Sequence, residues 1–184
     1  MSALSLALVH HPVLDRRGTV VSTSLTTLDL HDIARSARTY GAAAFFIVTP
    51  LVSQLGLAQT MMRYWRHGLG GQWNADRKKT MNLVETAGDL AEMRARVQAR
   101  FAGPARLLAT SARAERATVT VEQLRRELEE DGPPVVLVLG TGAGLAREAR
   151  EACDGMLEPI LGVGGYNHLS VRSAAAIYLS RLRG

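Results

Sequence analysis

The chain has 184 residues, of which 47% are apolar, and a formal net charge of +5. This length supports one sizeable α/β core and disfavours two, so we expect residues 1–184 to form a single domain. The single cysteine, Cys153, excludes an internal disulfide and favours the cytoplasm, and no stretch approaches the roughly 20 apolar residues of a membrane helix.

Apolar, β-rich runs recur along the chain and alternate with helical segments. The runs cover residues 4–9, 43–48, 81–84, 107–109 and 135–139, and a shorter one lies around residues 156–157. This alternation predicts an α/β fold with a mostly parallel sheet and helices on both faces. Because ligands of such sheets bind beyond the carboxyl ends of the strands, the candidate site positions are the loops that begin at Thr49, Thr110, Gly140 and Pro159.

The first part of the chain holds the excess of positive charge. Residues 1–79 carry nine Lys or Arg against four Asp or Glu, whereas residues 80–184 carry thirteen of each. A polyanion should therefore bind mainly to the first part, although an excess of this size also serves solubility alone. The best candidates for contacts with RNA phosphates are Arg38, Arg63, Arg66, Arg77, Lys78 and Lys79.

The segment from Gly68 to Lys79 interrupts the rhythm of strands and helices. Before it, a helix is predicted from a Thr49 N-cap, with Pro50 at its first position, to the neighbourhood of Gly68. Three glycines, Trp73 and three adjacent basic residues then predict a mobile loop that stacks on a base and touches phosphate. The alternative is an ordinary connection whose Trp73 packs on the body of the protein.

Two glycine-rich loops stand in the last third of the chain, each between a strand and a helix. The first is GTGAG at residues 140–144. The second covers residues 159–166 and leads into a helix rich in small residues, for which Asn167 is the predicted cap. Because glycines let backbone amides approach a ligand closely, two such loops near each other indicate one shared ligand.

These two loops resemble the second and third motifs of the SPOUT class of RNA methyltransferases. The matching stretches read LVLGTGAGL and EPILGVGGYNHLSVRSAAAIYL. Residues 29–41 resemble the first motif, and Arg35 takes the place of its arginine. Together with the N-terminal strand, the resemblance spans nearly the whole chain and is closest to a compact bacterial family related to the tRNA guanine-N1 methyltransferases.

The resemblance implies a SPOUT fold with a C-terminal trefoil knot, an obligate homodimer and an activity on tRNA or rRNA. It also implies the cofactor S-adenosylmethionine, held in a bent conformation mainly by backbone hydrogen bonds. The residues that the resemblance assigns to the cofactor are Thr110, Ser111, Gly140, Gly142, Ile160, Gly162, Gly164, Asn167, Leu169 and Ser170.

Three departures from the family pattern leave the methylated atom open. The second motif lacks the glutamate found in many ribose methyltransferases, with Gly142-Ala143 near its place, and Ser170 replaces the asparagine of the third motif. Both differences count against 2′-O-ribose methylation. By the same comparison, we expect no counterpart of the C-terminal domain of the tRNA guanine-N1 enzymes, and their base-binding aspartate has no obvious counterpart in the sequence.

The candidate catalytic residues lie on the helix expected near residue 29. Arg35, if it faces the partner subunit's cofactor, can stabilise a developing oxyanion or position a phosphate, and a plain surface arginine is the alternative. His31 and Asp32 are the nearby candidates for holding a proton, and Asp29 is expected to cap the helix. His10 is assigned no catalytic role. Nothing has metal-ligand spacing, so no catalytic metal is expected.

Two other functions remain open at this point. GTGAG after a strand also suggests a small nucleotide-dependent oxidoreductase, for which Glu158 is the only acid near the position that binds ribose. Its third glycine comes too soon for the usual dinucleotide spacing, which counts against this alternative. A noncatalytic RNA-binding protein that retains the fold is the other alternative, and it would bind RNA without transferring methyl groups.

Overall fold

The computed structural model describes residues 1–101, 103–113, 117–164 and 166–184. Its centre is a six-stranded sheet in the order β5-β4-β1-β7-β6-β8, in which every pair of neighbouring strands is parallel. The strands are β1 (Leu4–Val9), β4 (Ala44–Val48), β5 (Val84–Ala87), β6 (Arg106–Ala109), β7 (Val135–Gly140) and β8 (Gly155–Met156). The central strands β1, β4 and β7 are almost wholly buried, as their continuous apolar sequences require.

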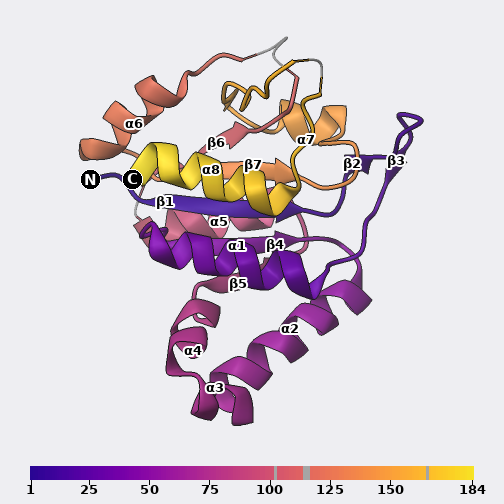
Figure 1. Ribbon diagram of the computed structural model, residues 1–184, viewed down its shortest axis with the longest axis vertical. Coiled ribbons are helices and arrows are strands. Elements are labelled where there is room, and N and C mark those ends of the chain that lie inside the picture. Colours follow the sequence, from indigo (N-terminus) through magenta and orange to yellow (C-terminus); the bar gives the residue numbers. More distant parts are fainter. Residues whose placement is uncertain (102, 114–116, 165) are drawn as a thin grey trace.

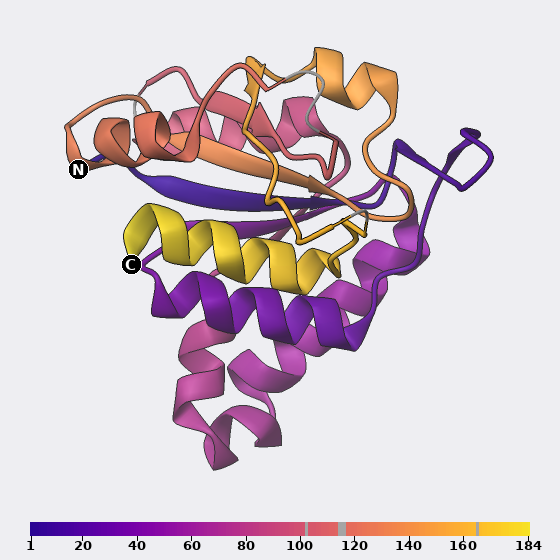
Figure 2. The same ribbon diagram turned by 45° about the horizontal axis from the view of Figure 1, so that its top comes forward.

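Helices cover both faces of this sheet (Figures 1 and 2). Alternate side chains of β1 point to opposite faces, so that Leu6 and Leu8 join one hydrophobic core and Ala7 and Val9 join the other. The first core is closed by α1 (Thr27–Thr39), α6 (Val121–Glu129) and α8 (Val171–Arg183), and the second by α5 (Leu90–Phe101) and α7 (Arg147–Glu151). The predicted α/β architecture is confirmed. The trefoil knot stays a prediction.

A helical arm extends beyond the β5 edge of the sheet (Figure 1). We call residues 52–81 the arm, and they form α2 (Val52–His67), α3 (Leu69–Trp73) and α4 (Ala75–Met81). The prediction of a mobile loop after Gly68 is therefore wrong, because most of this segment is helical. Met81 belongs to the buried end of α4 and not to a strand, so the strand predicted at residues 81–84 begins only at Val84.

The start of α2 also differs from the sequence-based expectation. Thr49 is fully buried at the end of β4, and its hydroxyl accepts the backbone N–H of Leu51 at 3.3 Å. Because these residues still belong to the turn that leaves the sheet, the helix begins at Val52 with Leu51 as its N-cap residue. Neither the predicted Thr49 cap nor Pro50 at the first helical position is correct.

A small hairpin stands at the carboxyl side of the sheet. It consists of β2 (Val13–Leu14) and β3 (Val20–Val21), which pair in antiparallel orientation. Within the described ranges, no helix is both long and apolar enough to cross a lipid bilayer.

Candidate active site

A pocket of about 400 Å³ lies where β6 and β7 end and α8 begins. Its wall is made by four loop segments, by one residue of α1 and by three residues of α8. The lining residues are Asp29, 110–113, 139–144, Ile160, 167–171, Ala174 and Tyr178. The pocket therefore occupies the position at the carboxyl ends of the strands where parallel sheets bind their ligands.

The pocket brings together eight of the ten residues that the sequence assigns to a cofactor. They are Thr110, Ser111, Gly140, Gly142, Ile160, Asn167, Leu169 and Ser170. Gly162 and Gly164 do not line it. Both are exposed in the adjoining loop, where Gly164 has a φ of +76° that favours glycine.

Asn167 ties two of the pocket loops together. Its Oδ1 accepts the backbone N–H of Gly162 at 3.1 Å, and its Nδ2 donates to the carbonyl oxygen of Ala112 at 2.9 Å. The predicted role of Asn167 as a helix cap is wrong, because α8 begins only at Val171. Ser170 is the cap and accepts the N–H of Ser173.

The loop at residues 140–144 needs its glycines for close backbone approaches. A Cβ on Gly140 would stand 2.6 Å from the backbone nitrogen of Leu145. Gly142 has a φ of +61°, and a Cβ there would stand 2.6 Å from the carbonyl oxygen of Leu14. Backbone hydrogen bonds from Ala143 to Leu14 and from Leu14 to Gly144 fix the loop against the β2–β3 hairpin. The shape of this pocket wall is thus built into the fold.

Hydrogen bonds that link the side chains of His10, Thr23 and Thr141 support the same loop. The Thr141 hydroxyl donates to the carbonyl oxygen of Val9 at 3.0 Å, so the neighbouring Thr23 hydroxyl must donate to Thr141. Thr23 then has no proton left for His10, whose Nδ1 lies 3.0 Å from its oxygen. His10 Nδ1 is therefore the donor, so the neutral form of the ring carries its hydrogen on Nδ1.

The charge state of His10 agrees with this arrangement. Its side chain is fully buried, and burial lowers the pKa of His10 to about 4. The other ring nitrogen, Nε2, is buried and has no hydrogen-bond partner among the described residues. A proton added there would be left without an acceptor, so His10 orients the loop and does not exchange protons at neutral pH.

Asp29 is the pocket residue whose position the sequence did not reveal. The expectation that it caps α1 is wrong, because Thr26 is the cap and accepts the N–H of Asp29. The carboxylate of Asp29 instead accepts hydrogen bonds from the Thr26 hydroxyl at 2.6 Å and from Nη1 of Arg172 at 3.1 Å. Only 9% of Asp29 is exposed, and it borders the pocket. The pocket therefore has one buried, well-held carboxylate.

The three predicted catalytic residues do not line the pocket. Arg35 is exposed on α1, with its guanidinium 3.8 Å from the Asp32 carboxylate, and Asp32 also faces Nε of Arg172 at 3.6 Å. His31 points to the arm instead, and its ring lies edge-on to Trp65 with 5.6 Å between ring centres. Burial lowers the pKa of His31, and the Arg77 guanidinium adds to this effect. Within one chain, the structure does not bring these residues together around a ligand.

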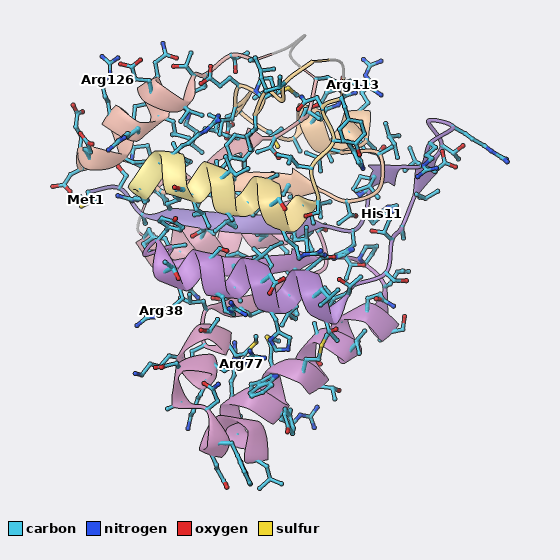
Figure 3. All side chains as sticks on the ribbon, in the orientation of Figure 1. Met1, His11, Arg38, Arg77, Arg113 and Arg126 are labelled. Atoms are coloured by element: carbon cyan, nitrogen blue, oxygen red, sulfur yellow. The ribbon has the colours of Figure 1, made fainter. Side chains whose placement is uncertain are left out.

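Among the described residues, three titratable side chains besides Asp29 line the pocket. Tyr178 donates its hydroxyl hydrogen to the Glu158 carbonyl at 2.9 Å, and burial raises the pKa of Tyr178 to about 12. This phenol stays protonated at neutral pH. His168 and Arg113 are exposed at the rim, and Arg113 stands beside the pocket loops in Figure 3. Among the described residues, no three His, Cys, Asp or Glu side chains gather in a group that could hold a metal ion.

The predicted RNA-binding residues fall into two groups. Arg66 and Arg77 serve the interior of the arm: Arg66 donates to the carbonyls of Met81 and Val84, and the Arg77 guanidinium lies 4.8 Å from the ring centre of Trp65. The remaining residues are exposed, namely Arg38, Arg63, Trp73, Lys78 and Lys79. Trp73 does not pack on the body of the protein.

The comparisons with known proteins show which family the chain resembles. A family model described as SAM-dependent RNA methyltransferase matches residues 3–184. A tRNA (guanine-N(1)-)-methyltransferase of Nitratidesulfovibrio vulgaris is 42% identical over 181 residues, which cover 98% of this chain but only 42% of the relative. An uncharacterized protein of Aquifex aeolicus is 38% identical over 177 residues, which cover 96% of this chain and 86% of that protein.

Solved structures share the fold at low sequence identity. The SpoU methyltransferase AviRb from Streptomyces viridochromogenes, in complex with the cofactor AdoMet, aligns with a TM-score of 0.60 and 17% identity. The alignment covers 98% of this chain and 57% of AviRb. This likeness shows the fold of the chain only. The chemistry of the chain has to be inferred from the residues of the pocket.

Proposed function

Because the chain belongs to the SAM-dependent RNA methyltransferase family, we propose that its pocket binds S-adenosylmethionine and that the chain transfers the donor's methyl group to RNA. The observation that carries this proposal is the pocket itself. Eight of the ten residues expected around the cofactor line one cavity at the carboxyl ends of β6 and β7. Their assembly from three separate loops supports the assignment.

The chemistry of the pocket wall fits this donor. Backbone groups of the loops at residues 110–113 and 140–144 offer hydrogen bonds to a base and a ribose, and Leu139, Ile160 and Leu169 offer apolar contacts to an adenine ring. The buried carboxylate of Asp29 suits a ligand that carries positive charge. The bound donor supplies an electrophilic methyl group on a positively charged sulfur, with a neutral leaving group.

The proton of the accepting RNA atom needs a base, and we assign this role to Asp29. Among the described residues that line the pocket, Tyr178 stays protonated and Arg113 is no base, which leaves Asp29 and the exposed His168. Asp29 is held in place by Thr26 and Arg172, so its carboxylate is already oriented. In this proposal Asp29 takes over the proton-holding role that the sequence suggested for His31 and Asp32.

We also propose that two copies of the chain form a homodimer. Large apolar side chains are exposed beside the pocket, in the loop before α8 and on α1; they are Leu28, Leu161, Val163, Tyr166 and Leu169. A second copy of the chain would remove them from water. The exposed Arg35 of α1 would then act on the pocket of the partner and not on its own. Sedimentation analysis at micromolar concentration measures this dimer.

We further propose tRNA, and with it the cytoplasm, as the setting of the reaction. The chain spans less than half the length of the curated tRNA (guanine-N(1)-)-methyltransferases that it matches, at 42% of each. The matching part of each relative is therefore joined to a further, longer part within one chain. A domain in such a chain is well placed to act on the same RNA.

The structure does not support the oxidoreductase alternative, because Glu158 has another role. Glu158 was the only candidate for binding a ribose, but its Oε1 accepts the backbone N–H of Val121 at 2.8 Å and so caps α6. A noncatalytic RNA-binding protein remains the second candidate. In such a protein, the groups that line the pocket would hold a ligand that regulates RNA binding.

Labelled methyl transfer tests the proposal. The purified protein is incubated with tritium-labelled S-adenosylmethionine and with tRNA or rRNA from a strain that lacks the gene. Label should enter tRNA, and at saturating donor concentration Asp29→Asn should lower kcat about a hundredfold, because the amide cannot accept the proton. Asp89→Asn is the matched control, because Asp89 caps α5 on the opposite face and asparagine caps equally well. Donor binding without transfer to any RNA would favour the noncatalytic candidate.

A further inference from the structure

We propose that the arm is a preorganised binding surface for unpaired nucleotides of the RNA substrate, separate from the methyl-transfer pocket. This inference rests on the proposed function for the identity of its ligand. It concerns residues 52–81, which extend beyond β5, whereas the pocket lies at the ends of β6 and β7 (Figure 1).

The tip of the arm is fixed by contacts that only glycine permits. Gly70 and Gly71 of α3 are buried against α2. A Cβ on Gly70 would stand 2.4 Å from the ring of Tyr64, and a Cβ on Gly71 would stand 2.2 Å from the carbonyl oxygen of Trp65. The glycines therefore bring α3 directly onto α2 and hold Trp73, the last residue of α3, in place.

Contacts with α2 also fix α4, the helix that leads from the tip of the arm back to the sheet. The guanidinium of Arg66 donates to the carbonyl oxygen of Met81 through Nε at 3.1 Å and Nη2 at 2.8 Å, which joins α2 to the end of α4. Arg77 of α4 lies over the ring of Trp65 in α2, between the two helices (Figure 3). These contacts are internal, so the arm does not need a ligand to take its shape.

The outer surface of the arm combines aromatic rings with positive charge. Trp73 is 88% exposed and Tyr64 is 51% exposed. Arg63, Lys78 and Lys79 are exposed on the same three helices. The arm carries five Lys or Arg against one Asp or Glu, which accounts for four of the five net positive charges of the chain. An exposed indole and exposed cations on one arm match the faces of unstacked bases and their phosphates.

This combination favours RNA over a protein or a second copy of the chain. A protein-protein contact is typically depleted of lysine at its centre, whereas stacking on RNA uses aromatic rings together with Lys and Arg. Since the arm lies outside the pocket, its contacts should strengthen RNA binding without changing the chemical step. Variants of the arm are therefore expected to raise KM for RNA and to leave kcat and donor binding unchanged.

Fluorescence anisotropy with labelled tRNA and with a labelled 20-nucleotide single strand tests the arm. Trp73→Ala should weaken binding about tenfold, and Trp73→Phe should restore most of it, because stacking needs an aromatic face. Lys78→Ala/Lys79→Ala should lower the slope of log Kd against log salt concentration by about 1.5, the value for two lost phosphate contacts.

Arg125→Ala/Arg126→Ala provides the matched control for charge. These adjacent arginines lie on α6, at the opposite end of the molecule from the arm, and their removal changes the net charge equally (Figure 3). The control should retain the wild-type salt dependence. Equal losses in both double variants, or wild-type affinity in Trp73→Ala, would overturn the proposal.

Two further outcomes separate this inference from the proposed function. RNA binding through the arm without donor binding would uphold the arm and refute the methyltransferase. Loss of a dimer in Trp73→Ala, measured by sedimentation, would identify the arm as a protein contact and overturn the RNA proposal.

Discussion

The pocket and the arm use glycine in two different ways. In the loop at residues 140–144, Gly142 takes a positive φ and lets the backbone turn toward a ligand site. In the arm, Gly70 and Gly71 are helical, and the absence of a side chain lets two helices touch. A cluster of glycines can thus mark a binding loop or a tight helix contact. The neighbouring side chains decide between the two.

The largest expected effect concerns acid stability of the pocket region. His10 has a pKa of about 4 in the folded chain, below its usual value of 6.5. Because the unfolded chain binds the proton more readily, stability is full above pH 6.5 and falls as the pH drops from 6.5 to 4. The total loss is about 3 kcal/mol. Urea unfolding across this range should show it, and His10→Asn should remove most of the dependence.

The asparagine variant keeps a hydrogen-bond donor at position 10 and removes the titratable ring. Its amide nitrogen can donate to Thr23 as Nδ1 does, without a titratable ring. A wild-type slope of stability against pH in His10→Asn would assign the acid sensitivity to other groups.

The next largest effect is expected at Gly142. Alanine there would take a strained φ and meet the Leu14 carbonyl oxygen, so S-adenosylmethionine should bind about thirtyfold more weakly. Calorimetric titration measures this change. Gly18→Ala is the control, since Gly18 has a φ of +81° at the hairpin tip and open space around it. Equal losses in both variants would contradict a specific role of Gly142 in the pocket.

The corresponding change in the arm is Gly71→Ala. The added methyl group would displace α3 from Trp65 without removing any charge, and RNA binding should weaken about tenfold with donor binding intact. Gly56→Ala is the matched control in α2, where nothing lies within 4 Å of the added carbon. That control should stabilise the helix by about 0.5–1 kcal/mol and leave RNA binding unchanged.

The smallest effect is expected from the side chains that support the pocket loop. Thr23→Val removes the two hydrogen bonds that link His10 to Thr141 while preserving shape, so the loop is held less firmly and donor binding should weaken about fivefold. Thr23→Ser should retain wild-type affinity. If valine and serine behave alike in titrations, the hydroxyl chain does not position the loop.

The sequence predicted the sheet and the pocket loops because their signals are local. Buried runs such as Val135–Leu139 read directly as strands, and glycines after them mark the loops. Residues 68–79 of the arm were predicted as a loop because glycines such as Gly70 and Gly71 disfavour a helix unless another helix lies close against them. Only the three-dimensional contact with Tyr64 and Trp65 reveals that reason.

Asp29 shows a second limit of sequence-based reasoning. An aspartate near a helix start is read as a cap, and the competing cap Thr26 stands three residues earlier. The decisive contact is Arg172, which is distant in sequence and lies on α8. Arg35 was assigned by its motif position and His31 by its chemistry and its nearness to Arg35, yet within one chain they face solvent and the arm.

Calorimetric titration with S-adenosylmethionine tests the central claim most directly. The wild-type chain should bind the donor, Gly142→Ala should bind it about thirtyfold more weakly, and Gly71→Ala should bind it as the wild type does. A nicotinamide dinucleotide should give no heat of binding. Absence of donor binding, or equal losses in the two glycine variants, would contradict the assignment of the pocket at residues 110–113 and 139–144.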